Sequence, residues 1–204
     1  MKPKLSTAML TAALVLATAT LAWAVKVGMQ APDFTGTASN GKQISLAEYR
    51  GKYVVLEWHN QGCPFVRKQY ESGNMEALQR KWTKKNVVWL SVISSAPGQQ
   101  GFVTAEEENE YLQKMKAAPT AVLLDPTGTI GHLYGAKTTP NMFVIDPHGK
   151  LIYEGAIDDH STADQDDIKG SKNYVDAALT EAMNGGPVIV PTTRPYGCAV
   201  KYGD

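Results

Sequence analysis

Two cysteines are the residues best suited to covalent chemistry in this sequence. The 204 residues contain only Cys63 and Cys198, which stand far apart in the chain. A thiolate is a strong nucleophile. Oxidation joins two thiols in a disulfide, and reduction separates them again. A zinc site needs further ligands at close spacing, and neither cysteine has a second cysteine beside it. The pair therefore indicates a disulfide, a redox couple or both, and we expect no metal and no cofactor.

The position of Cys63 favours ionisation of its thiol. It follows a β-rich run over residues 53–58 and directly precedes Pro64. Proline is favoured at the first helical position, which predicts Cys63 as the N-cap of a helix. Free N–H groups and the positive end of the helix dipole stabilise a thiolate there, and such cysteines reach pKa values of about 3.5 to 7.5. Arg67, one turn later, is a candidate for a supporting positive charge.

Several other ionisable groups lie near these positions in sequence. His59 ends the strand before Cys63 and is close enough to tune it, but we expect a solvated side chain. The acidic runs over residues 106–108 and 158–167 are expected to be solvated faces or loops. A divalent-metal site formed by Asp158, Asp159 and His160 is the alternative for the second run.

The first 24 residues have the features of a secretory signal peptide. Lysines at positions 2 and 4 precede an apolar run over residues 8–21, and Ala22-Trp23-Ala24 is a small-x-small cleavage pattern. The run is short for a membrane span. We therefore expect residues 1–24 to be removed on export, leaving residues 25–204 as one domain in the periplasm or outside the cell. An uncleaved anchor is the alternative.

Charge and length narrow the class of protein. Lysine plus arginine and aspartate plus glutamate number 20 each, so no basic excess suggests nucleic acid or an anionic membrane surface. About 180 residues remain after the leader, the usual length of one domain with one core. We expect neither a nucleic-acid partner nor a membrane-embedded chain.

The mature part alternates strand and helix patterns. Asn40-Gly41 predicts a hairpin turn between residues 34–37 and 43–46. Apolar runs over 53–58, 87–93 and 121–125 indicate buried strands. Helical patterns separate them: one begins at Pro64 and is interrupted at Gly73-Asn74, and one begins at the capping box of Thr104 and Glu107.

The second half closes this core. The turn over residues 146–149 predicts a hairpin between 141–145 and 151–154, and an amphipathic helix is expected over 173–183. Residues 188–204 show no clear period. The order of hairpin, βαβαβ, hairpin and helix predicts an α/β domain with a central mixed sheet, helices on both faces and an N-terminal β-hairpin extension.

These motifs, in this order, resemble the thioredoxin-like superfamily and, within it, the peroxiredoxin-like redoxins of the AhpC/TSA class. The segments after residue 154 resemble a secreted subgroup with one cysteine at each end. The matching segments are Gly28-x-x-Ala31-Pro32-Asp33-Phe34, Cys63-Pro64-Phe65-Val66, Thr139-Pro140, Phe143-Val144-Ile145-Asp146-Pro147-x-Gly149, Gly155-Ala156-Ile157-Asp158-Asp159 and Arg194-Pro195-Tyr196-Gly197-Cys198.

The resemblance implies a thioredoxin fold in which Cys63 is the redox cysteine and Thr139-Pro140 is a cis peptide facing it. Two departures matter. Asn60 stands where thioredoxins have the first cysteine of C-x-x-C and where typical peroxiredoxins have threonine. The peroxiredoxin arginine beside the late strand is also missing, so Arg67 is the candidate substitute.

The leading hypothesis is an exported thiol oxidoreductase. A peroxide or a disulfide would oxidise Cys63, and Cys198 with an external thiol reductant, such as a thioredoxin-like protein, would restore it. Alternatively, Cys198 forms a permanent disulfide with Cys63, and the protein is a non-catalytic binding or scaffold module. A third hypothesis is a periplasmic metal handler that uses Cys63 and nearby histidines.

Overall fold

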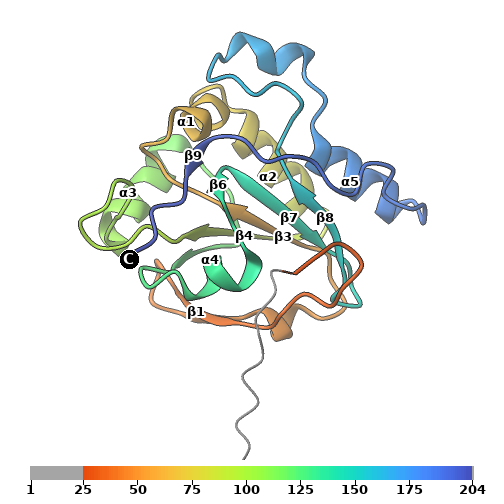
Figure 1. The fold of residues 1–204 in the computed structure, drawn as a ribbon, viewed down its shortest axis with the longest axis horizontal. Helices are drawn as coiled ribbons and strands as arrows, with labels where there is room; N and C mark the ends of the chain where they lie inside the picture. Colours follow the sequence, from red (N-terminus) through yellow and green to blue (C-terminus); the bar gives the residue numbers. More distant parts are fainter. Residues whose placement is uncertain (1–24, 204) are drawn as a thin grey trace, which may run out of the picture.

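Residues 25–203 form a mixed α/β domain in the computed structural model (Figure 1). These are the residues that the structure describes, so the predicted leader lies outside them. The main sheet has the strand order β2-β1-β5-β4-β3-β7-β8, and a small second sheet pairs β6 with β9. The strands are β1 (Thr35–Ala38), β2 (Gln43–Ser45), β3 (Val54–Trp58), β4 (Val88–Ile93), β5 (Ala121–Leu124), β6 (Thr138–Thr139), β7 (Asn141–Ile145), β8 (Leu151–Gly155) and β9 (Cys198–Ala199). The helices are η1 (Leu46–Tyr49), α1 (Pro64–Glu71), α2 (Asn74–Thr83), α3 (Ala105–Met115), α4 (Thr129–Tyr134), η2 (Asp166–Gly170) and α5 (Tyr174–Met183).

The centre of the main sheet is parallel, as the crossover pattern predicted. β3 pairs with β4 and β4 with β5 in parallel, while β1 and β7 join antiparallel on the two sides. Parallel neighbours need long crossovers, here α1 with α2 and then α3. Every residue of β3 and β4 is buried, because helices or loops cover both faces.

Helices cover both faces of the sheet, as predicted. Alternate residues of a strand point to opposite faces, so Val55 and Leu56 of β3 belong to different cores. Val55 packs with side chains of α1, α2 and α5, and α3 packs beside these helices over β4 and β5. Leu56 packs with side chains of η1 and α4 on the other face. Figure 1 shows α4 in front of the sheet.

The predicted helix boundaries are confirmed where capping chemistry sets them. The helical pattern after Pro64 divides into α1 and α2 at Gly73, which has φ +77°. At the start of α3, the Thr104 hydroxyl accepts from the N–H of Glu107, and the Glu107 carboxylate accepts from the N–H of Thr104. The break between α1 and α2 and the start of α3 are therefore determined by the local sequence.

The tail after Pro187, which shows no clear period in sequence, is nevertheless ordered by its partners. Thr192 forms a β-bridge with Glu154, and β9 pairs antiparallel with β6. Figure 1 shows the tail running from α5 across the sheet past α1 and ending near α3 and α4. A two-residue strand shows no period, so its place depends on contacts distant in sequence. Among residues 25–203, no helix is long and apolar enough to cross a membrane.

Candidate active site

Cys63 occupies the N-cap of α1, as predicted, with Pro64 at the first helical position. Its backbone N–H donates to the Asn60 carbonyl at 3.0 Å. Its side chain is fully buried, and the thiol donates to the Thr139 carbonyl oxygen at 3.0 Å. The thiol therefore sits between the start of α1 and β6.

The second cysteine lies beside the first because β9 pairs with β6. The Thr139–Pro140 peptide bond is cis, as predicted, and Cys198 stands directly opposite Thr139 in the antiparallel register. Gly197 has φ +133°, and a Cβ there would lie 2.1 Å from the Thr139 carbonyl oxygen. Only glycine therefore lets the tail approach this closely. Both cysteines are free thiols.

The two thiols have pKa shifts of opposite sign. Burial raises the pKa of Cys63, but the Cys198 side chain and backbone N–H, the Thr139 side chain and the Val66 backbone N–H favour the thiolate and leave the pKa below its ordinary value. Burial and the neighbouring Cys63 raise the pKa of Cys198 to about 11. Cys63 is therefore the more acidic of the two thiols: on ionisation it gives up its hydrogen bond to the Thr139 carbonyl and accepts one from the protonated Cys198.

Asn60 shapes the loop that leads to Cys63. Its side-chain oxygen accepts from the Gly62 N–H at 2.9 Å, and its amide donates to the Gln100 side chain at 3.0 Å. The side chain is buried. At the position of the first thioredoxin cysteine, this chain thus has a hydrogen-bonded amide that holds the loop.

Arg67 does not accompany the buried thiol, and the expectation that it supplies the cation is corrected. Its guanidinium pairs with Glu71 at 2.7 Å, one helical turn on, and its side chain is 55% exposed. The i, i+4 spacing on an exposed helix face favours this local pair. Any cation that supports Cys63 has to come from elsewhere.

His59 is buried, not solvated as expected. Its side chain is 1% exposed, with Nδ1 3.7 Å from Glu57 Oε1 and Nε2 3.9 Å from Glu108 Oε1. Its ring also contacts those of Tyr70 and Tyr111. The sequence signal that was missed is Glu57, a charged residue inside an otherwise apolar central strand. Glu108, assigned to a solvated face, is buried as well.

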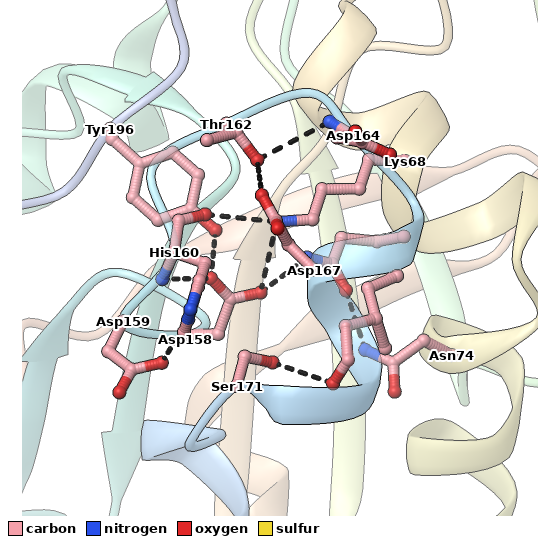
Figure 2. A network of polar contacts seen from close by, with 12 residues as sticks. Lys68, Asn74, Asp158, Asp159, His160, Thr162, Asp164, Asp167, Ser171 and Tyr196 are labelled. Atoms are coloured by element: carbon pink, nitrogen blue, oxygen red, sulfur yellow. Dashed lines mark hydrogen bonds and ion pairs between the residues drawn. The ribbon is translucent and has the colours of Figure 1, made fainter.

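Asp158 is likewise buried instead of forming part of a solvated acidic loop. Its carboxylate accepts from the Tyr196 hydroxyl, from Gln69 Nε2 at 2.7 Å and from the His160 N–H at 3.0 Å. Figure 2 shows Tyr196 of the tail and Lys68 of α1 directed toward this region from opposite sides. The Lys68 ammonium lies 3.8 Å from Asp158 and donates to the His160 carbonyl at 2.9 Å.

This network contradicts the alternative metal site at Asp158, Asp159 and His160. The Asp158 oxygens are engaged by protein donors, and the His160 ring pairs with Asp159 at 2.7 Å. Within residues 25–203, no group of three or more His, Cys, Asp or Glu side chains is placed to hold a metal ion. The network instead joins the tail that carries Cys198 to the helix that Cys63 begins.

An open cavity of about 630 Å³ adjoins the cysteine pair. Phe65, Thr138 and Gly197, each one or two residues from Cys63, Thr139 or Cys198, contribute to its wall, together with Arg194. The Arg194 side chain is exposed. Neither cysteine is among the residues that line the cavity.

Comparison with known proteins identifies the family of this chain. The sequence model of the AhpC/TSA family matches residues 27–154, more than half of the chain. The chain belongs to the AhpC/TSA family. The match includes Cys63, Thr139 and Pro140, whereas Cys198 and the Asp158 network lie beyond its end.

Curated relatives and solved structures are also similar to this chain. The thiol-disulfide oxidoreductase ResA of Bacillus thuringiensis subsp. konkukian is 29% identical over 130 residues, which cover 64% of this chain and 69% of the relative. An uncharacterized conserved protein from Geobacillus kaustophilus matches with a TM-score of 0.73 at 23% identity, over 87% of this chain and 93% of that one. A secreted disulfide oxidoreductase of Mycobacterium tuberculosis matches with a TM-score of 0.50 at 20% identity, over 67% and 92%. The structural likenesses show the thioredoxin-like fold.

Proposed function

We propose that this protein is an exported thiol oxidoreductase in which Cys63 is the reactive thiol and Cys198 the resolving thiol. The observation that carries the proposal is the placement of both cysteines at Thr139, with the pKa of Cys63 lowered and that of Cys198 raised. Reactive thiols are thiolates, and a helix N-terminus stabilises them. The family membership and the relatives named as thiol-disulfide oxidoreductases support the redox class.

With a peroxide as substrate, the Cys63 thiolate attacks one peroxide oxygen and the O–O bond breaks. Cys63 becomes a sulfenic acid, and the leaving alkoxide or hydroxide takes a proton. The Cys198 sulfur then attacks the sulfenic sulfur, a disulfide forms and water leaves. An external dithiol, such as that of a thioredoxin-like protein, reduces the disulfide and is itself oxidised.

With a disulfide as substrate, the Cys63 thiolate attacks one sulfur and displaces the other as a thiolate. Cys198 resolves the mixed disulfide by attacking the Cys63 sulfur, which releases the second substrate thiol. The names of the relatives favour this substrate class, since they are thiol-disulfide oxidoreductases. The peroxide class rests on the AhpC/TSA resemblance, and this chain lacks the arginine that typical members carry.

Export, and with it a location in the periplasm or outside the cell, is proposed from residues 1–24. The basic start, the apolar run and the Ala22-Trp23-Ala24 pattern support it. Intact-mass measurement of protein from the exported fraction tests the cleavage, and a mass that includes Met1 to Ala24 would contradict it.

Substitution of each cysteine tests the redox proposal. Stopped-flow oxidation of pre-reduced protein, with peroxide and with a disulfide in separate runs, should show no oxidation in Cys63→Ser. Cys198→Ser should keep the first oxidation and accumulate a sulfenic acid or mixed disulfide, because only resolution is lost.

Thermal melts of both variants separate this proposal from the scaffold alternative. A permanent Cys63–Cys198 disulfide predicts that both substitutions destabilise the fold equally, by a few kcal/mol, and that neither changes a redox rate. Equal destabilisation of the two variants, with no oxidisable thiol in the wild-type protein, would contradict the proposed enzymatic function.

A further inference from the structure

The side chain of His59 has the surroundings of an imidazolium. Both ring nitrogens are buried and neither has a hydrogen-bond partner. A neutral imidazole presents one donor and one acceptor, whereas the protonated ring presents two donors. Here both nitrogens face carboxylate oxygens, Nδ1 toward Glu57 at 3.7 Å and Nε2 toward Glu108 at 3.9 Å. Two facing acceptors match two N–H donors and therefore favour the charged ring.

Glu57 is a fixed negative charge in the core. Although burial raises its pKa, hydrogen bonds and the nearby His59 bring the pKa below the ordinary value. Four side chains donate to its carboxylate, which therefore needs no proton of its own. The donors are Trp89 Nε1 at 2.7 Å, the Tyr70 hydroxyl at 2.8 Å, the Ser91 hydroxyl at 3.0 Å and Gln79 Nε2 at 3.2 Å.

We propose that the His59 imidazolium is the buried cation that favours the Cys63 thiolate, the role that the sequence suggested for Arg67. His59 stands four residues before Cys63, at the end of the strand that leads into α1. It acts on the thiol as a positioning residue, through charge. The inference rests on the proposed function in taking Cys63 as the reactive thiol.

The His59 ring contacts Tyr70 of α1, the helix that Cys63 begins, and Tyr70 and Cys63 lie in the same buried cluster. The electrostatics of the site agree with this placement. Burial lowers the pKa of His59, but Glu108, Glu57 and Cys63 together raise it above its ordinary value. An interaction through which Cys63 raises the pKa of His59 must also lower the pKa of Cys63, since coupling between two sites is reciprocal. The thiolate and the imidazolium therefore stabilise each other.

The other titratable groups around His59 do not supply a cation. Tyr70 of α1 and Tyr111 of α3 contact the ring, and burial raises the pKa of both, so they stay neutral. Burial raises the pKa of Glu108, while His59 lowers it. Glu76 of α2 acts on Glu57 and adds only negative charge. His59 is thus the positive group of the part of this cluster that the structure describes.

The reciprocal measurement leaves the buried cluster intact. We expect Cys63→Ser to lower the pKa of His59 by about one unit or more, since a nearby opposite charge shifts a pKa by about 1 to 3 units. The readout is the ring-proton NMR titration of His59 in reduced protein. An unchanged His59 pKa in Cys63→Ser would overturn the proposal.

The forward measurement compares two substitutions in a Cys198→Ser background, where Cys63 is the single cysteine. The Cys63 pKa is read from the Cβ chemical shift of labelled cysteine against pH. His59→Gln should raise it by about one unit or more, and Arg67→Gln should leave it unchanged. A shift with Arg67→Gln and none with His59→Gln would return the role to Arg67.

These titrations are independent of turnover. A reciprocal pKa coupling in a protein that oxidises no substrate would leave the inference intact and refute the proposed function. An active enzyme without the coupling would refute the inference alone. If His59→Gln fails to fold, the His59 titration in Cys63→Ser still decides.

Discussion

At the scale of single residues, hydrogen-bond partners determine whether a buried carboxylate keeps its charge. Glu57 and Glu76 are both carboxylates below 3% exposure, on a strand and a helix that pack together. Glu57 receives four hydrogen bonds, so its charged form is favoured. Neither carboxylate oxygen of Glu76 has a partner, and burial raises its pKa to about 7. The charge of Glu57 belongs to the candidate site, whereas that of Glu76 destabilises the fold.

Glu76→Gln should therefore stabilise the protein at neutral and alkaline pH. The folded pKa of about 7 lies above the ordinary 4.5, so the wild-type protein loses stability as pH rises between these values. We expect a gain in the free energy of unfolding of about 1–2 kcal/mol above pH 7, vanishing below about pH 4.5. Urea unfolding between pH 4 and 8 measures it.

The matched control for that series is Glu110→Gln on α3, where the side chain is exposed. It should produce no pH-dependent gain. A gain of equal size in both variants would show that the effect comes from net charge and not from burial of Glu76.

At the scale of elements, the sequence predicted what local chemistry determines. The Asn40-Gly41 turn, the Thr104 capping box and the start of α1 at Pro64 all depend on residues within a few positions. β9 was not predicted, because its position depends on pairing with β6 some 60 residues earlier in the chain. The buried state of His59 was missed for the same reason: Glu108, which faces it, comes from α3.

The close approach of β9 to β6 makes Gly197 a test of this element. In Gly197→Ala, the new Cβ would collide with the Thr139 carbonyl oxygen, and φ +133° disfavours alanine. We expect displacement of Cys198 to slow Cys63–Cys198 disulfide formation at least about tenfold, since misplacement by about 1 Å can cost a hundredfold. The first oxidation of Cys63 should change much less. Stopped-flow fluorescence of pre-reduced protein separates the two steps.

Gly170→Ala is the control, because a Cβ at this position of η2 meets no atom within 4 Å and the backbone is unstrained. It should resolve its disulfide at the wild-type rate. Wild-type resolution in Gly197→Ala as well would contradict the role assigned to the β6–β9 contact.

At the scale of the whole molecule, the tail after Pro187 holds Cys198 against the thioredoxin-like core. Before the cysteine, the Tyr196 hydroxyl donates to Asp158. After it, the Tyr202 hydroxyl donates to the Ala136 carbonyl at 2.7 Å, and its ring stacks on His132 with centroids 4.0 Å apart. Cys198 is therefore held from both sides. In the proposed cycle we expect an external reductant to reach it when this segment opens.

If the tail opens as one unit, its two tyrosine contacts contribute to a single opening equilibrium. Loss of one hydrogen bond is worth about 1 kcal/mol, or about fivefold in that equilibrium. In a Cys63→Ser background, Tyr196→Phe and Tyr202→Phe should each raise the alkylation rate of Cys198 about fivefold, and together about 25-fold. Tyr134→Phe is the matched control, since its hydroxyl donates to the Pro32 carbonyl at 2.8 Å and to no residue of the tail. A double variant that reacts no faster than either single variant would show that the two ends of the tail open separately. Wild-type rates in all variants would show that Cys198 reacts without release of the tail.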